Sequence, residues 1–275
     1  MKRILILPLI FSLVGLSSCK DKTDEVDYNP NVQSAKDYVR AEDGVLEILD
    51  AFFKGVHDTA VMSSGFNYID ACSVRYYPED DSMTYGYGQV NRLCQDGKFR
   101  RGMFVVVFDG NVFNENVTAN IWTDSLMVDD LPVELEMKIK NLGLSSDTYL
   151  MYSVNVNSSL FILPDTTKIH GISITTDFMM VWTEGYQTPE IHEDDTYMIT
   201  GSASGLSSDL YEFSVNITDS LVNYVDCYWL KSGKSQITVP SAAYPDGIID
   251  YIEEDGCYNE FHFYFNDNLF YEVIK

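Results

Sequence analysis

A two-residue hydrophobic period recurs through most of the chain after Phe66 and constrains the fold more than any other feature. Along residues 133–140 apolar and charged side chains alternate strictly, which is the pattern of a strand with one buried and one wet face. Residues 103–108 are instead apolar on both faces, which predicts a central strand covered from two sides. The alternation recurs at residues 150–156, 211–217 and 261–265, and a longer run at 172–182 carries apolar residues on one face.

Short turn-forming segments rich in Ser, Asp, Asn and Gly separate these runs. Links of this length favour antiparallel hairpins, because a parallel connection needs a long crossover segment. The pattern indicates about a dozen strands, more than one flat sheet usually holds. The sequence therefore predicts an all-β domain over residues 66–275, mainly antiparallel and hairpin-connected, arranged as a curved sheet, a sandwich or a barrel-like body.

One helical segment, residues 35–65, precedes the strands. Apolar residues recur at helical spacing from residue 41 to residue 62. Glu42 and Asp43 are expected in the first turn, where a negative charge suits the helix dipole. Because the segment also contains two glycines, its stability must come from packing against an apolar surface. We therefore expect an N-terminal amphipathic helix that covers one face of the sheet.

The first residues have the pattern of a bacterial lipoprotein signal. Lys2 and Arg3 precede an apolar stretch, residues 4–16, which is too short to span a bilayer. Two serines then lead directly into Cys19, as in a lipobox. The expectation is that residues 1–18 are a signal peptide and that Cys19 carries the acyl chains, palmitate among them, that anchor the mature protein stably.

The residues that follow the lipobox, 19–34, are polar and charged, and they predict a flexible acidic tether between membrane and domain. Acidic residues this close to a lipidated cysteine resemble the export signal of some surface lipoproteins, although a solvated linker would have the same composition. We expect a lipid anchor in the outer membrane. The sequence does not decide between its periplasmic and its cell-surface face.

The net charge of the chain is −24, from 42 acidic and 18 basic residues. Nucleic-acid binding requires clustered Lys and Arg to release counterions from phosphates, so this balance argues against nucleic acid as a partner. Because 45% of the residues are hydrophobic, the acidity does not indicate disorder. We interpret the charge as a source of solubility carried by the tether and the turns.

Four cysteines remain after Cys19, and an even number in an exported protein favours disulfides. Spacing alone leaves three pairings open. An internal similarity favours one of them, since residues 72–94 and residues 227–257 each read as a cysteine strand, a turn, a return strand and a second cysteine. The prediction is two hairpins closed by Cys72–Cys94 and Cys227–Cys257 disulfides.

Several motifs together resemble a family of uncharacterised cell-envelope lipoproteins of Bacteroidota, and the likeness covers nearly the whole chain. The motifs are DAC at 70–72, YGYG at 85–88, CQDGKFRRG at 94–102, WTEGYQT at 182–188 and DCYW at 226–229. The resemblance implies an outer-membrane or surface lipoprotein, and it supplies no catalytic residues. The chain departs from the family between Tyr251 and Cys257, where the family tends to have glycines.

The sequence contains no recognisable catalytic or cofactor motif. The GSASG segment at 201–205 has Ala203 where a nucleophile elbow needs serine. His192 and Glu193 lack the second histidine of a zinc protease, and there is no phosphate-binding glycine loop. The acidic clusters lack the spacing of a calcium loop. We therefore expect no metal, no cofactor and no enzymatic activity.

Aromatic residues are the one surplus that suggests a binding function, with 19 Tyr, 15 Phe and 3 Trp. Those near turns or on the outer phase of a strand could stack on a sugar ring or a protein partner. The candidates for such stacking are Tyr85, Tyr87, Trp122, Tyr186 and Trp229. The leading hypothesis is a non-enzymatic envelope lipoprotein that binds a glycan or an envelope protein. The alternatives are a carrier of an apolar ligand in a β cavity and a hydrolase with an unrecognised site.

Overall fold

The computed structural model describes residues 32–162, 171–188, 191–225, 227, 229–242, 245–252, 260–266 and 268–273. Its helices are α1 (Gln33–His57) and α2 (Thr59–Ser64), with short 3-10 turns η1 (Pro78–Asp80) and η2 (His192–Asp194). The expected signal peptide, Cys19 and most of the expected tether lie outside the described residues. Neither helix combines the length and the hydropathy that a membrane-spanning helix needs.

Fourteen strands are present in the described part of the chain. They are β1 (Phe66–Ile69), β2 (Cys72–Tyr77), β3 (Ser82–Leu93), β4 (Phe99–Phe108), β5 (Thr118–Val128), β6 (Leu131–Leu144), β7 (Leu150–Phe161), β8 (Ser173–Glu184), β9 (Thr196–Leu206), β10 (Glu212–Tyr224), β11 (Leu230–Thr238), β12 (Gly247–Tyr251), β13 (Glu260–Phe265) and β14 (Asn268–Val273). Each strand pairs with the next in an antiparallel ladder, from β1 at one edge to β14 at the other. The all-β, hairpin-connected fold class is confirmed, and the sheet is open.

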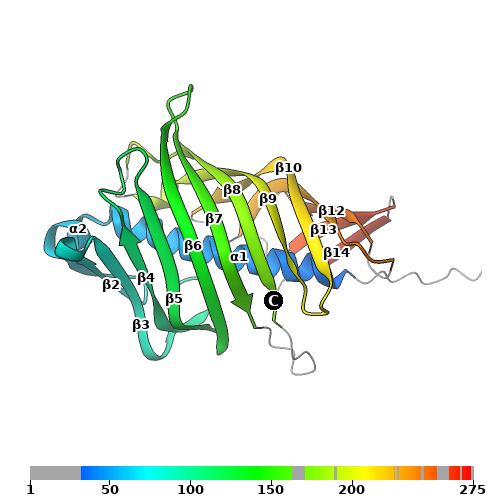
Figure 1. Cartoon of the computed structure of the whole chain (residues 1–275), viewed down its shortest axis with the longest axis horizontal. Helices are drawn as coiled ribbons and strands as arrows, with labels where there is room; N and C mark the ends of the chain where they lie inside the picture. Colours follow the sequence, from blue (N-terminus) through cyan, green and yellow to red (C-terminus); the bar gives the residue numbers. More distant parts are fainter. Residues whose placement is uncertain are drawn as a thin grey trace, which may run out of the picture.

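The long sheet curves around helix α1, which runs along its length while the strands cross it (Figure 1). Tyr85 of β3 donates a hydrogen bond to the main-chain oxygen of Phe52 in α1, at 3.0 Å. Tyr251 of β12, far along the sheet order, donates to Glu42 of the same helix. Since strands from both halves of the sheet contact one helix, the concave side of the sheet is filled by α1.

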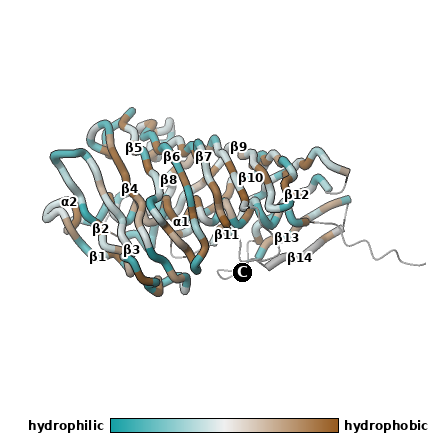
Figure 2. Tube along the Cα trace, turned by 60° about the horizontal axis from the view of Figure 1, so that its bottom comes forward, coloured by the Kyte–Doolittle hydropathy of each residue, from teal (hydrophilic) through white to brown (hydrophobic). Residues whose placement is uncertain are grey.

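The alternation along the strands is confirmed in β6. Val133, Leu135 and Met137 are buried there, whereas Glu134 and Glu136 are exposed. Both hydrophobic and hydrophilic residues occur along the long strands throughout the sheet (Figure 2). The apolar phase faces the helix, and the other phase faces solvent.

The prediction that residues 103–108 are covered on both sides is wrong. Phe104 and Val106 are buried, but Met103 on the opposite phase of β4 is 38% exposed. Helix α1 covers one face of the sheet, and no second layer of described residues lies on the other. The apolar residues on the convex face are therefore partly open to water.

Helix α1 begins earlier than expected and is more deeply buried. It starts at Gln33, so the last residues assigned to the tether are helical and Glu42 lies in the middle of the helix rather than in its first turn. Sixteen of its 25 residues are buried. The helical segment is also broken at Asp58, whose Oδ1 accepts a hydrogen bond of 2.7 Å from the Val61 N–H and caps α2.

Candidate functional site

One stripe of α1 stays polar and partly accessible while the rest of the helix is buried. Its residues are Lys36, Arg40, Asp43, Glu47, Asp50 and Lys54, which are three or four positions apart and therefore share one face. This face meets a cleft of about 90 Å³ that lies between β1–β4 on one side and β10–β11 on the other. The cleft is where the open sheet leaves the helix uncovered.

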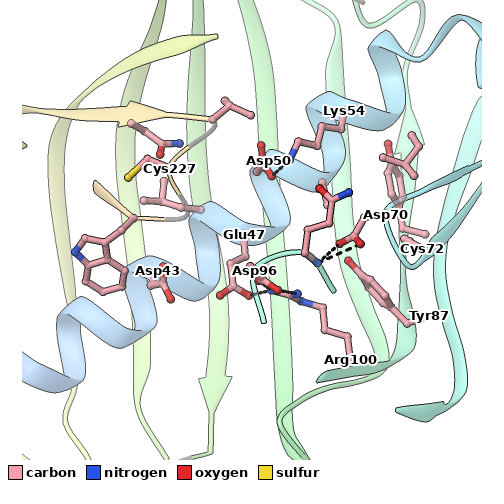
Figure 3. Close-up of a pocket in the computed structure, with 18 of the residues that line it drawn as sticks. Asp43, Glu47, Asp50, Lys54, Asp70, Cys72, Tyr87, Asp96, Arg100 and Cys227 are labelled. Atoms are coloured by element: carbon pink, nitrogen blue, oxygen red, sulfur yellow. Dashed lines mark hydrogen bonds and ion pairs between the residues drawn. The ribbon is translucent and has the colours of Figure 1, made fainter. Parts of the chain in front are cut away.

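Side chains from three parts of the chain meet at this cleft. Figure 3 shows Asp43, Glu47, Asp50 and Lys54 on α1, with Asp70, Cys72, Tyr87, Asp96 and Arg100 on one side and Cys227 on the other. The second wall also contains Asn223, Val225, Trp229 and Leu230. Sequence positions almost two hundred residues apart, from Asp43 to Trp229, thus line one cavity.

A network of ion pairs joins α1 to the start of β4. Arg100 donates from Nη1 and Nη2 to the two oxygens of Asp96, at 2.9 and 2.5 Å, and from Nη2 to Glu47 Oε2 at 2.6 Å. Lys98 Nζ lies 2.7 Å from Asp43 Oδ2 and also contacts Glu47 Oε1. Both oxygens of Glu47 are therefore occupied, and each cation of this network has two carboxylate partners.

The pKa values of the two acidic residues that α1 contributes to this network, Asp43 and Glu47, are shifted in opposite directions. Burial raises the pKa of Asp43, and the neighbouring negative charge of Glu47 raises it further against the effect of Lys98. Burial would also raise the pKa of Glu47, but the charges of Lys98 and Arg100 outweigh it and lower the pKa. Glu47 is thus the ionised anchor of the network.

The remaining charged residues of the cleft are less completely paired. Lys54 Nζ lies 2.8 Å from Asp50 Oδ2, four residues before it on α1. Burial raises the pKa of Asp50, although Lys54 opposes the shift. Asp70 accepts hydrogen bonds of 3.0 and 3.2 Å from the Gln95 N–H. Asp50 Oδ1 forms no hydrogen bond with another described residue.

The predicted Cys72–Cys94 disulfide is not formed, and both residues are buried free thiols. The reason is the length of β3. Its pairing with β2 ends at Ser73 and Gly86, but the strand runs on to Leu93, so Cys94 does not lie opposite Cys72. Burial raises the pKa of Cys72 to about 12, which keeps the thiol protonated.

The second predicted hairpin is only partly visible. Cys227 lines the cleft and is disulfide-bonded. Cys257, the partner that the sequence predicts, lies outside the described residues. The Cys227–Cys257 pairing therefore stays a prediction.

Three of the five candidate aromatic residues, Tyr85, Tyr87 and Trp229, line the cleft. Tyr85 is a core residue, fully buried with its ring 4.3 Å from that of Phe104 in a stacked arrangement. Tyr87 and Trp229 are 7% and 8% exposed, and Trp229 Nε1 is buried without a hydrogen-bond partner. These two rings are the candidates that the structure leaves next to open space.

The other two aromatic candidates lie elsewhere. Trp122 is 39% exposed on β5, between Val105 and Glu136 of the neighbouring strands. Tyr186 follows β8 in a turn, with its ring centroid 6.3 Å from that of Tyr149. The five residues predicted from turn proximity thus do not form one platform.

A second hollow, about 560 Å³ and wide open, lies over β7–β10 and is lined mainly by Ser, Thr and Asn. The hydroxyl groups of Ser159, Thr175 and Ser204 form hydrogen bonds within the protein. Ser159 Oγ donates to the Ile174 main-chain oxygen at 2.7 Å and accepts from the Ile174 N–H at 2.8 Å, which replaces ladder bonds between β7 and β8. Thr175 and Ser204 hydroxyls lie 3.0 Å apart. We interpret this hollow as a local opening of the sheet.

Sequence reasoning did not identify the charged stripe of α1. The spacing of Asp43, Glu47, Asp50 and Lys54 is visible in the sequence, but it is also that of any solvated helix face. Nothing in the sequence places Lys98 and Arg100 beside that face. Within the described ranges, no group of three or more His, Cys, Asp or Glu side chains is arranged to hold a metal ion.

No family model, curated protein or solved structure matches the chain. The resemblance to envelope lipoproteins stays a prediction from its motifs, and the cleft has to be interpreted from its own chemistry.

Proposed function

We propose that the chain is a non-enzymatic lipoprotein of the outer membrane, anchored through Cys19, whose folded domain binds a small polar ligand in the cleft beside α1. The lipobox pattern and the acidic segment after it support the anchor. The observation that carries the binding function is the cleft itself. It combines charged side chains, amides and two aromatic rings in a concave site, as ligand sites commonly do.

The ion pairs favour binding over catalysis. Asp43 and Glu47 have pKa values shifted in opposite directions, which is a property of acid–base pairs in hydrolases. However, both oxygens of Glu47 are held by Lys98 and Arg100, so this carboxylate has no free atom with which to attack a substrate. The network is suited to hold α1 against the β4 side of the cleft.

The alternative function, carriage of an apolar ligand, receives less support from the volume and the lining of the cleft. A cavity that encloses a lipid-sized ligand needs roughly 300 Å³ or more. Helix α1 fills the concave side of the sheet, and the cleft beside it is about 90 Å³ with five carboxylate residues in its lining.

The anchor is tested by replacing Cys19 with alanine. Without the thiol no diacylglycerol can be attached, so we expect the Cys19→Ala protein to move from the detergent phase to the aqueous phase in Triton X-114 partitioning. Lys22→Ala, in the same polar segment, is the matched control and should stay with the detergent. A Cys19→Ala protein that remains in the detergent phase would contradict the anchor.

The binding function is tested by filling the cleft. Small polar compounds are screened for an increase in the melting temperature of the full-length protein in detergent. Ala51 lines the cleft, so Ala51→Trp should abolish the shift caused by any compound that binds there. Asn120→Trp, on an exposed position of β5, should leave it unchanged. Shifts that survive Ala51→Trp would place the ligand elsewhere and refute the cleft as the site.

A further inference from the structure

The convex face of the sheet, which is turned away from α1, carries a row of four charged side chains on β6. They are Glu134, Glu136 and Lys138, which are exposed, and Lys140, which is half-buried. None of these side chains forms an ion pair or a hydrogen bond with another described residue. Their register partners on β5 and β7 are uncharged, namely Thr118, Asn120, Trp122, Ser153, Asn155, Ser158 and Leu160.

The order of the four charges makes β6 complementary to itself in reverse. Two acidic residues come first and two basic residues follow. A second β6 that runs antiparallel over the first therefore places Glu136 over Lys138 and Glu134 over Lys140. One two-fold axis produces this arrangement, and it lies between the two copies, crosses the strands and passes level with Met137. An axis along the strands would instead place like charges together.

The apolar side chains of the neighbouring strands fit the same axis. The register of the sheet sets Val106 of β4 level with it, so Val105 of one copy lies over Val107 of the other. Both valines are half-buried in the single chain. On β5 the axis brings Trp122, which is 39% exposed, over Asn120 of the other copy. Contact between the copies would remove this apolar strip from water.

The charge balance of β6 distinguishes this surface from the rest of the chain, whose net charge is −24. Two such chains repel each other wherever acidic surfaces meet. A strand with two acidic and two basic residues avoids that repulsion, and its order of charges favours one orientation of the partner.

We propose that two copies of this chain associate through the convex face of β4–β6, with their β6 strands antiparallel. Glu136 and Glu134 of each copy pair with Lys138 and Lys140 of the other. The cleft lies on the helix side of the sheet, so this inference does not rest on the proposed ligand binding.

The curvature of the sheet limits the size of the contact. Figure 1 shows β6 in front of α1, with the convex face toward the viewer. On a convex face only the middle strands of two copies can meet. Four strands about 4.8 Å apart, each contributing about six residues of 3.3 Å, cover on the order of 400 Å² per copy. A standard interface covers about 800 Å² per partner, so the dimer is weak and reversible.

The test is sedimentation equilibrium of the full-length protein in detergent of matched density, over a range of protein concentrations. The wild type should change from monomer to dimer as its concentration rises. Glu136→Lys places like charges opposite each other, and so does Lys138→Glu, so each should weaken association at least about tenfold. Glu212→Lys, with the same charge change at an exposed position of β10, is the matched control and should associate like the wild type.

Mixing the two variants tests the orientation of the partner. Positions 136 and 138 are both basic in Glu136→Lys and both acidic in Lys138→Glu, so the mixture should form a heterodimer although neither variant associates well alone. The double variant Glu136→Lys/Lys138→Glu should regain the homodimer. Circular dichroism melting checks that all variants fold.

Three results would overturn the inference. The first is a wild type that stays monomeric up to about 500 µM. The second is a dimer that survives Glu136→Lys, or that Glu212→Lys weakens equally. The third is loss of association in the single variants without recovery in the mixture or the double variant, which excludes the antiparallel pairing of β6. Ligand binding in the cleft is decided separately by the thermal screen.

Discussion

Two glutamates five residues apart on α1 show how differently one helix can be held at two places. Glu42 is buried against β12, where the hydroxyls of Tyr38 and Tyr251 donate to its two oxygens, the first at 2.5 Å. Glu47 faces the cleft, where Lys98 and Arg100 supply positive charge. Burial raises the pKa of Glu42 to about 7, whereas the two cations lower that of Glu47.

The contrast indicates that the part of α1 around Glu42 is a structural contact, whereas the part around Glu47 borders the cleft. At Glu42 the carboxyl group is satisfied by neutral donors and closed to solvent, so it joins the helix to the C-terminal strands. At Glu47 the charges are balanced by ion pairs at the border of a cavity, and the unpaired groups around it stay available. The same residue type is thus a core contact in one place and part of a site wall in the other.

Removing a cation beside Glu47 should lower the free energy of unfolding more than any other change proposed here. Arg100→Met leaves the buried Asp96 carboxylate without its cation and leaves Glu47 with Lys98 alone, which should cost about 3–5 kcal/mol of unfolding free energy in urea denaturation. Arg101→Met is the control, because its partner Asp130 is 66% exposed, and it should change the unfolding free energy far less. Equal losses in the two variants would mean that the cleft network is not buried in solution.

The pH dependence of the unfolding free energy should reveal the contribution of Glu42. Its pKa rises from 4.5 to about 7 on folding, so the folded state favours the protonated form. The stabilisation from this group is therefore complete below pH 4.5 and is lost as the pH rises through about 7, by about 3 kcal/mol. The difference in unfolding free energy between the wild type and Glu42→Gln, measured from pH 4.5 to 8, should fall by this amount. Because Asp43 and Glu47 titrate in both proteins, a flat difference would contradict the environment described for Glu42.

The smallest effect is expected at the tyrosine contact. Tyr251→Phe removes one of the two donors to Glu42 and should cost about 1–2 kcal/mol at neutral pH. It should also raise the pKa of Glu42 further, since the Tyr251 hydrogen bond lowers it. Tyr264→Phe on β13, where the side chain is 36% exposed, should stay within about 0.5 kcal/mol of the wild type in the same urea titration. A loss at Tyr264 as large as that at Tyr251 would show that the effect is not specific to Glu42.

Much of the sheet could be predicted from the sequence, because strand periodicity is a local property. The alternation in residues 133–140 corresponds directly to the burial of β6. The burial of β4 could not be predicted, because an apolar strand does not reveal whether one or two of its faces will be covered. Likewise, the helix start at Gln33 was missed because Gln33 and Ser34 look like tether residues. In the folded chain Ser34 is buried, and so is Asp37 one turn later. Asp37 accepts hydrogen bonds of 2.7 Å from the N–H and the hydroxyl of Ser208.

The candidate site was predictable in its residue types and not in its location. Tyr87 and Trp229 were selected for their aromatic rings near turns, and both line the cleft, but Trp122 and Tyr186 met the same criterion and do not. The cysteine pairing at 72–94 failed for a related reason. Hairpin closure depends on where the pairing of two strands stops, which is set by β-strand length and register rather than by the spacing of the cysteines.

The sequence by itself determined the class of fold, because strands and helices can be recognised from local hydrophobic periods. Apolar residues recur at about every second position in a strand and at about every third or fourth position in a helix. It also supplied the charge and the lipobox pattern, which are written in consecutive residues. The tertiary structure alone decided that the sheet curves around a buried helix, that its strands leave one helix face open, and that Arg100 and Lys98 lie beside Glu47. These features depend on contacts between residues far apart in the chain, which form only when the sheet folds against the helix.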